Sequence, residues 1–257
     1  MRSLFVSDLH YDLKQLDWVY EVAENLDLVI IGGDLLDISA PVDARAQILV
    51  VLKYLERLRG RTQVIVCSGN HDLDARGSDG EKYARWIGKA QAFGVHTDGR
   101  SAELDGTLFT VCPWWDGPKT REAVGRLLAR DQARAKKQWI WVYHSPPQDS
   151  PTSWVGKRHI GDVDLVAWIR ELEPNLVLSG HIHQSPFVKN GSWVDRLGDT
   201  WVFNPGRQIG PSPTRILFDS DKATALWVSL AGAEIVKLDE PLRRPLAEPT
   251  DLPPWLM

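Results

Sequence analysis

Short apolar runs alternate with longer amphipathic stretches along most of the chain. A short apolar run bounded by polar residues or glycine is typical of a buried strand, and apolar positions that recur with a period near 3.6 residues indicate a helix. The pattern predicts strands at Leu4–Ser7, Leu28–Gly32, Gln63–Ser68, Trp139–Tyr143 and Leu176–Ser179. It predicts helices between these strands at Asp12–Asn25, Asp43–Leu58, Glu81–Phe93, Lys119–Lys137 and Asp162–Leu172.

The pattern changes to hairpins after His183. Short apolar runs are separated there by the turn dipeptides Gly198-Asp199 and Asp221-Lys222, and a last strand is predicted at Glu234–Leu238. Asp105-Gly106 predicts one earlier hairpin. Strands that alternate with helices and are then followed by hairpins predict an α/β (α+β) fold, in which a sandwich of two sheets is flanked by helices.

The length of 257 residues suits one large domain, and we assign residues 1–239 to it. Hydrophobic residues make up 43% of the chain and charged residues 25%, as in an ordinary globular protein. The segment 240–257 is rich in proline and is expected to be a tail that lies across the surface.

The formal net charge of -4 makes a long nucleic acid an unfavourable partner, because nucleic-acid binders usually carry a basic excess. Cys67 and Cys112 each lie in an apolar run, so we expect both to be buried and not to form a disulfide. No apolar run approaches the roughly 20 residues that a membrane span needs, and no signal peptide is visible. We therefore expect a cytoplasmic protein with no membrane contact and no obligate protein partner.

Polar residues follow five of the predicted strands at the point where each strand ends. They are Asp8 and His10, Asp34 and Asp37, Asn70 and His71, His144, and His181 with His183. Five of the seven histidines of the chain fall at these positions. Because ligands bind outside the carboxyl ends of strands in open α/β sheets, we expect these side chains to converge on one edge.

The residue types at these strand ends are typical of a catalytic metal site. Imidazole, carboxylate and amide oxygen form a mixed N/O set without thiolate, which favours Mn²⁺, Fe²⁺/Fe³⁺ or Zn²⁺ and excludes a structural thiolate zinc site. Seven of these residues are candidate ligands, which is too many for one catalytic ion with an open position and suits two divalent ions that share a carboxylate. They are Asp8, His10, Asp34, Asn70, His144, His181 and His183. Gly33, Gly69 and Gly180 each precede a candidate ligand and would let the backbone turn sharply beside the ions.

The order and placement of these motifs resemble the calcineurin-like metallophosphoesterase superfamily. The motifs are Asp8-x-His10, Gly33-Asp34-x-x-Asp37, Gly69-Asn70-His71-Asp72, His144 and Gly180-His181-x-His183. The resemblance implies a four-layer αββα sandwich of two mixed β-sheets with a dinuclear metal site. It also implies that Asp8, His10 and His183 hold one ion, that Asn70, His144 and His181 hold the other, and that Asp34 bridges them.

The resemblance implies a phosphohydrolase in which a metal-bridging hydroxide attacks the phosphorus of a small-molecule phosphate ester. His71 would lie beside the phosphate and act as general acid, and Asp37 would orient it. Asp37 has a helix N-cap as its alternative role. A small phosphodiester is the expected substrate, and the alternatives are a phosphomonoesterase, a nuclease or a scaffold without catalysis.

Four residues outside the motifs are candidate substrate contacts. Trp115 and Trp154 could stack on a flat group, although packing in the core is the alternative for each. Arg158 lies in a basic loop and Arg207 follows a predicted strand, so either could contact phosphate. A solvated basic turn is the alternative for Arg158.

Overall fold

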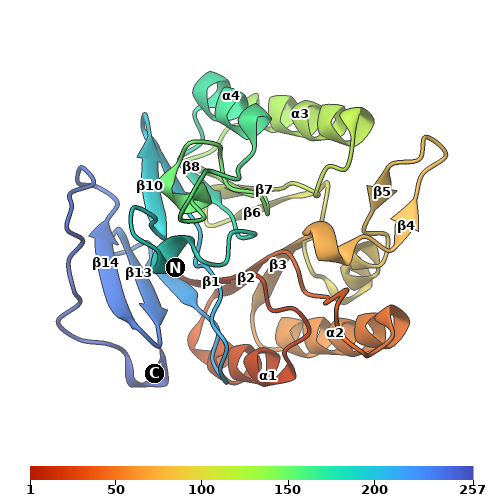
Figure 1. Cartoon of the computed structure of the whole chain (residues 1–257), viewed down its shortest axis with the longest axis horizontal. Helices are drawn as coiled ribbons and strands as arrows, with labels where there is room; N and C mark the ends of the chain where they lie inside the picture. Colours follow the sequence, from red (N-terminus) through yellow and green to blue (C-terminus); the bar gives the residue numbers. More distant parts are fainter. Residues whose placement is uncertain (257) are drawn as a thin grey trace.

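The computed structural model describes residues 1–256 and contains two six-stranded mixed sheets (Figure 1). The first sheet has the order β14 (Gly232–Lys237), β13 (Thr224–Ser229), β12 (Arg215–Asp219), β1 (Arg2–Val6), β2 (Leu28–Gly32) and β3 (Gln63–Cys67). The second has the order β10 (Val194–Leu197), β11 (Thr200–Phe203), β9 (Leu176–Leu178), β8 (Gln138–Val142), β7 (Thr107–Val111) and β6 (Ser101–Leu104). Strands β1, β2 and β3 are parallel, as are β7, β8, β9 and β11.

Helices cover the outer face of each sheet (Figure 1). The first sheet carries α1 (Leu13–Val22) and α2 (Ala44–Arg59), and the second carries α3 (Pro118–Gln132) and α4 (Val163–Leu172). The order of layers is therefore helix, sheet, sheet, helix. The predicted αββα sandwich of two mixed sheets is confirmed, and so are the hairpins predicted after His183.

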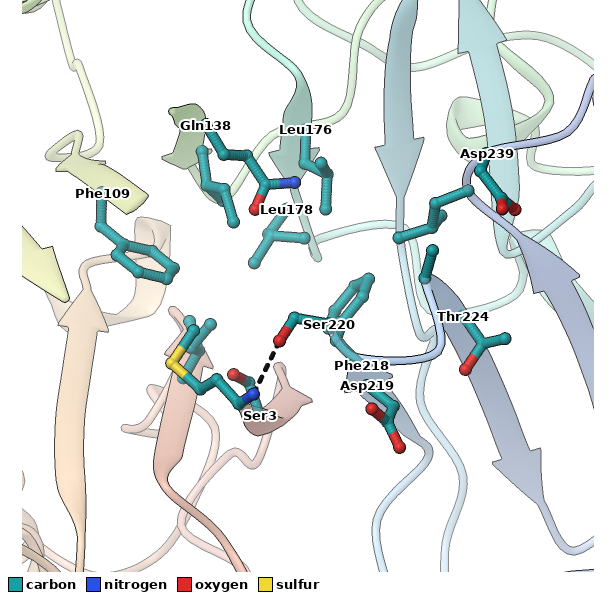
Figure 2. A pocket seen from close by; sticks show the side chains of 15 residues that line it. Ser3, Phe109, Gln138, Leu176, Leu178, Phe218, Asp219, Ser220, Thr224 and Asp239 are labelled. Carbon is teal, nitrogen blue, oxygen red and sulfur yellow. Dashed lines mark hydrogen bonds between the residues drawn. The ribbon is translucent and has the colours of Figure 1, made fainter. Parts of the chain in front are cut away.

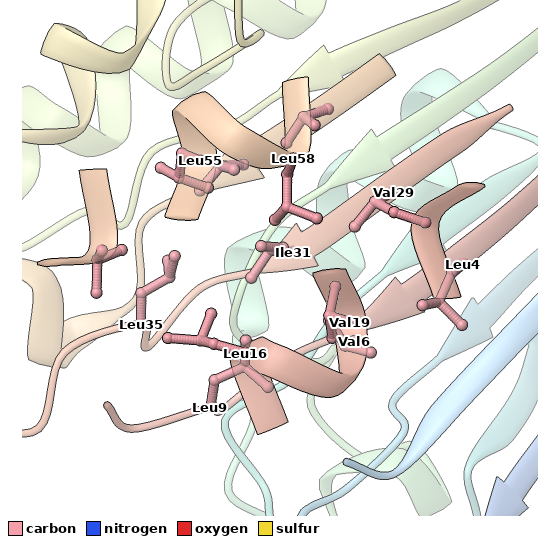
Figure 3. Close-up of a cluster of buried hydrophobic side chains, with 14 of the residues drawn as sticks. Leu4, Val6, Leu9, Leu16, Val19, Val29, Ile31, Leu35, Leu55 and Leu58 are labelled. Atoms are coloured by element: carbon pink, nitrogen blue, oxygen red, sulfur yellow. The ribbon is translucent and has the colours of Figure 1, made fainter. Parts of the chain in front are cut away.

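Three apolar clusters fill the spaces between the four layers. Successive side chains of a strand point to opposite faces, so β1 sends Leu4 and Val6 toward α1 and α2 and sends Phe5 into the space between the sheets. Figure 3 shows the first of these clusters, in which Leu16 of α1 and Leu55 of α2 meet the strands. Because both faces of each central strand are buried, these strands are continuous apolar runs in the sequence.

The helix predicted at Glu81–Phe93 is wrong. The segment begins as strand β5 (Lys82–Tyr83), which pairs with β4 (Ala75–Arg76), and continues as a 3₁₀ helix at Ile87–Phe93. The Glu81 carboxylate accepts hydrogen bonds from the backbone amides of Lys119 and Thr120 at 2.9 and 2.8 Å. Glu81 thus binds the first turn of α3 and does not begin a helix of its own segment.

Helix α3 ends at Gln132, five residues before the predicted end at Lys137. The Lys136 ammonium folds back and donates to the backbone carbonyls of Asp131, Gln132 and Arg134. Helix ends leave carbonyls without partners, and a lysine that binds them replaces further helical turns.

The proline-rich segment 240–257 lies against the domain over its described part. Leu242 and Leu246 pack against the cluster between the sheets, and Leu252 and Trp255 pack against the α1 and α2 cluster. The division into 1–239 and 240–257 stays a prediction. Among the described residues, no helix is both long enough and apolar enough to cross a membrane.

An apolar cavity of about 270 Å³ lies between the two sheets (Figure 2). Phe109, Leu178 and Phe218 line it, together with Ser3 and Gln138 at the starts of β1 and β8. It therefore opens at the edge of the sandwich opposite to the carboxyl ends of the parallel strands. The residues with candidate chemistry lie at those carboxyl ends.

Candidate metal centre

The loops after β1, β2, β3, β8 and β9 bring the predicted ligands to one edge of the sandwich. Their ligand atoms form three overlapping groups, and within each group these atoms lie within 4.8 Å of one another. The groups are Asp8 with His10 and His183, His10 with Asp34 and His71, and Asp34 with His144 and His181. Parallel strands place their carboxyl ends at a shared edge, which explains how residues so distant in sequence meet.

Several of these residues have left-handed backbone conformations. The φ angle is 56° at Asp8, 43° at His10, 53° at Asp34 and 68° at His181. Residues other than glycine rarely adopt such angles, and they persist where the surroundings hold them in place. Here the amide of Asp8 donates to the Gly33 carbonyl at 3.0 Å, and that of His10 donates to the Asp34 carbonyl at 2.9 Å.

Asp34 is the carboxylate that two of the three groups share. Its Oδ2 is 3.2 Å from His144 Nε2 and 3.7 Å from His10 Nε2. Its Oδ1 accepts a hydrogen bond from the His71 amide at 2.8 Å. The Asp34 carboxylate thus faces the imidazoles of His144 and His10, while the backbone amide of His71 fixes its orientation.

Asn70 Oδ1 and His144 Nε2 are among the buried polar atoms of the described residues that have no hydrogen-bond partner. His144 is oriented by its other ring nitrogen, since Nδ1 lies 2.6 Å from the Gly32 carbonyl and donates to it. Buried polar atoms are nearly always satisfied, and metal-binding histidines commonly donate their second nitrogen to a carbonyl. The two unsatisfied atoms therefore fit a metal ion.

The charges of the site affect the protonation of its histidines. Burial alone would lower the pKa of His144, but the neighbouring Asp34 and Asp8 raise it to about 10. Burial lowers the pKa of His10 to about 4 despite the same carboxylates, and the charge of Arg207 adds to this effect. Burial and His144 lower the pKa of His181 to about 4. The low pKa values leave His10 and His181 neutral and able to bind a cation, and the raised pKa of His144 reflects the negative charge of two carboxylates that a divalent cation would neutralise.

The sequence model of the calcineurin-like phosphoesterase superfamily domain matches residues 1–223. The chain belongs to this superfamily. Among solved structures, TT1561 of Thermus thermophilus is similar at 15% identity and a TM-score of 0.59, with 92% of this chain and 98% of that chain covered. A search of curated proteins found no match.

Purple acid phosphatase PPD1 from yellow lupin seeds is also similar, at 15% identity and a TM-score of 0.52. The likeness covers 93% of this chain and 52% of the lupin chain. At these identities, structural likeness shows the fold, and it agrees with the superfamily fold that the motifs predicted.

Asp72 is a residue of the superfamily motifs to which the sequence assigned no role. Its buried carboxylate accepts four backbone hydrogen bonds, from Asp34 and Gly69 at 2.8 Å and from Leu35 and Leu36 at 3.0 Å. It thus joins the loop after β2 to the loop after β3 and fixes Asp34. The sequence feature that points to a role for Asp72 is its position in the Gly69-Asn70-His71-Asp72 motif.

The glycines of the motifs permit close approach of loops. A Cβ added at Gly180 would lie 2.6 Å from Asp8 Oδ2, and one added at Gly33 would lie 2.6 Å from His144 Nδ1. At Gly69 the added atom would lie 2.1 Å from Asp34 Oδ1 and 2.6 Å from the Asp34 amide nitrogen. The predicted close approach at these three glycines is present.

We expect Gly69→Ala to displace Asp34, because the φ of Gly69 is -108° and the conflict is therefore steric alone. The free energy of unfolding should fall by about 1–3 kcal/mol, the usual effect of overpacking. Metal content measured by elemental analysis should fall with it. Gly88→Ala is the matched control, since an added Cβ there meets nothing within 4 Å. Equal stability and metal content in the two variants would contradict the steric role of Gly69.

His71 and Asp37 lie together, but no hydrogen bond joins their side chains. Asp37 Oδ1 is 4.0 Å from His71 Nδ1, and the Ile38 amide donates to that nitrogen at 3.4 Å. The alternative role of Asp37 as a helix N-cap is not observed, because Asp43 caps α2. Asp37 instead accepts the Ser39 amide at 2.8 Å. Its orienting action on His71 stays a prediction.

The four candidate substrate contacts have different surroundings. Arg207 is close to the ligands, because its amide donates to the His183 carbonyl at 2.9 Å and its charge acts on His10. The Trp115 indole N–H donates to Asp162 at 2.8 Å, and the Trp154 indole N–H donates to the Lys189 carbonyl at 2.9 Å. Arg158 is exposed. Their contacts with substrate stay predictions.

Proposed function

We propose that this protein hydrolyses phosphate esters with the help of two divalent metal ions. The central position of Asp34 carries the proposal, because this carboxylate lies within reach of both sets of histidines. Membership of the calcineurin-like phosphoesterase superfamily supports the reaction class.

In the proposed arrangement, Asp8, His10 and His183 hold one ion, and Asn70, His144 and His181 hold the other, with Asp34 between them. Two of the three groups of ligand atoms, Asp8 with His10 and His183 and Asp34 with His144 and His181, support this assignment, as does the unsatisfied Asn70 Oδ1. The donor set favours Mn²⁺, Fe²⁺/Fe³⁺ or Zn²⁺. When bound, such a pair lowers the pKa of a coordinated water and neutralises charge on the phosphoryl oxygens.

In this proposal, protein side chains supply the proton for the leaving oxygen and part of the positive charge beside the phosphoryl oxygens. A water oxygen loses a proton to solvent and forms a bond to phosphorus, and the bond from phosphorus to the leaving oxygen breaks. His71 gives a proton to that leaving oxygen and regains one from solvent. The His71 ring lies edge-on to the His10 ring with centroids 4.5 Å apart, so the acid is beside the ligand cluster. Arg207 would neutralise a phosphoryl oxygen, a role that its hydrogen bond to the His183 carbonyl and its charge near His10 support.

We further propose that the substrate is a small phosphodiester. A diester releases an alkoxide that needs a proton, and His71 can supply it. The net charge of -4 disfavours a long nucleic acid. A phosphomonoesterase, a nuclease and a scaffold without catalysis are the alternatives that the experiment must separate.

A substrate panel on metal-reconstituted protein tests the reaction and the substrate class together. We expect bis-aryl phosphate to be turned over faster than aryl monophosphate, a phosphopeptide or long DNA under one metal condition. Much faster turnover of the monoester or phosphopeptide would overturn the diester preference, and preferred cleavage of DNA would favour the nuclease. The absence of turnover on every ester, with both ions bound, would identify a scaffold.

A further inference from the structure

A second cavity, of about 240 Å³, lies directly beside the proposed metal ligands. We call it the aromatic pocket and define it by six of the residues that line it. They are Trp114, Trp115, Tyr143, Ser145, Ile160 and His181. Since His181 belongs to both the pocket and the ligand cluster, a group in the pocket would lie next to the reacting phosphate.

Trp114 forms the wall between the aromatic pocket and the metal centre. Its ring centroid is 5.2 Å from that of His181 and 5.7 Å from that of His144. The Trp114 amide donates to Ser68 Oγ at 2.9 Å, and the Ser68 amide donates to Asp98 at 2.8 Å. The loop that carries Trp114 is therefore tied to the end of β3, just before the Gly69-Asn70-His71 motif.

The opposite wall is fixed by Asp162. One oxygen of this carboxylate accepts both the Trp115 indole N–H and the Tyr143 hydroxyl, each at 2.8 Å. Its other oxygen accepts the amides of Asp164 and Leu165, which caps helix α4. Two aromatic rings of the pocket lining are thus held by a rigid helix end, so little side-chain conformational entropy is lost when a ligand enters the pocket.

Core packing does not explain Trp114. Trp115 packs against the cluster between the second sheet and its helices, whereas none of the three core clusters of the described residues contains Trp114. Trp114 is only partly buried, and it lines the cavity. A partly exposed indole next to the proposed metal-ligating histidines is suited to contact a ligand.

We propose that the aromatic pocket binds a planar aromatic substituent of the phosphate ester, either an aryl ring or a nucleobase. This inference rests on the proposed phosphohydrolase function. The size agrees, since an apolar cavity of about 150 Å³ already accepts benzene. The aromatic walls also fit a planar ring of either kind, because stacking on an aromatic side chain is tolerant of the identity of the ring.

The first experiment measures kcat/KM for a methyl aryl phosphate, a methyl nucleoside phosphate and a dialkyl phosphate. Trp114→Leu should lower kcat/KM for the two aromatic esters by about 10- to 100-fold more than for the dialkyl ester, with the difference in KM. Ile160→Trp should have the same selective effect by filling the pocket from its exposed rim. Trp168→Leu, at a tryptophan of α4 that does not line the pocket, is the matched control.

A second experiment measures binding without turnover, so that failure of the pocket and failure of the enzyme can be told apart. Phenylphosphonate should bind the metal-loaded protein about tenfold more tightly than methylphosphonate by calorimetry, and both pocket variants should remove this difference. Equal binding of the two probes to the unmodified protein would overturn the pocket, whatever the catalytic result. A preserved difference without any turnover would support the pocket and overturn the proposed function. A preference for only one of the two aromatic esters would show whether aryl ring or nucleobase is the natural occupant.

Discussion

Asp34→Ala is expected to lose both metal ions and to lower kcat/KM by about 10³-fold or more. Each bound ion contributes several kcal/mol of charge stabilisation to phosphoryl transfer, and each 1.36 kcal/mol is a factor of ten in rate. The geometric reason is that Asp34 Oδ2 lies 3.2 Å from His144 Nε2 and 3.7 Å from His10 Nε2, so its removal affects both halves of the site. Metals per chain should be counted by elemental analysis beside the kinetic measurement.

Two further variants make this experiment specific. Asn70→Ala should lose one ion, because the only ligand that it removes is the unsatisfied Oδ1. Asp199→Ala, at an exposed turn between β10 and β11, should keep both ions and full activity. Treatment with a chelator should reproduce the Asp34→Ala loss in the unmodified protein, and Mn²⁺, Fe²⁺ or Zn²⁺ should restore it. Unchanged metal content in Asp34→Ala would show that this residue does not bridge.

The sequence could predict where the candidate metal ligands meet because of how parallel strands are arranged. A polar residue at the end of an apolar run is visible in the sequence, and the fold brings such ends to one edge. Asp8, Asp34 and His144 were located in this way, and the structure brings their ligand atoms together. The same reasoning locates the layers, because doubly buried strands are continuous apolar runs.

Features that depend on contacts between distant segments could not be predicted. Glu81 binds the first turn of α3, and this contact, which local periodicity cannot reveal, accompanies the replacement of the predicted helix by a short strand. Asp72 holds the second loop through four backbone amides, although the sequence shows only one more carboxylate in a motif. Likewise, the sequence offers Trp115 and Trp154 as candidate substrate contacts. Only the packing distinguishes Trp114, which no core cluster of the described residues includes, from Trp115, which packs on one.

His71→Ala is expected to keep both ions and to lower kcat by roughly 10²–10⁴-fold on esters with poor leaving groups, which is the contribution of one general acid. His71 shares a group with His10 and Asp34, but its neighbour Asn70 and the imidazoles of His144 and His181 provide the proposed ligands. Loss of the His71 ring should therefore remove a proton donor and leave the metal sites occupied. His96→Ala, at a histidine outside the ligand groups, is the matched control.

Esters with different leaving groups show whether His71 acts as a proton donor. An alkoxide with a high pKa needs a proton as the bond to phosphorus breaks, whereas an activated aryl oxide leaves without one, so the loss in His71→Ala should be much smaller for a nitrophenyl ester than for an alkyl ester. A plot of log kcat against the pKa of the leaving alcohol should therefore become steeper in the variant. An unchanged slope with a uniform loss would mean that His71 stabilises charge on the phosphoryl oxygens and donates no proton. A loss of metal in the variant would mean instead that His71 is a ligand, as its 4.8 Å group with His10 and Asp34 would allow.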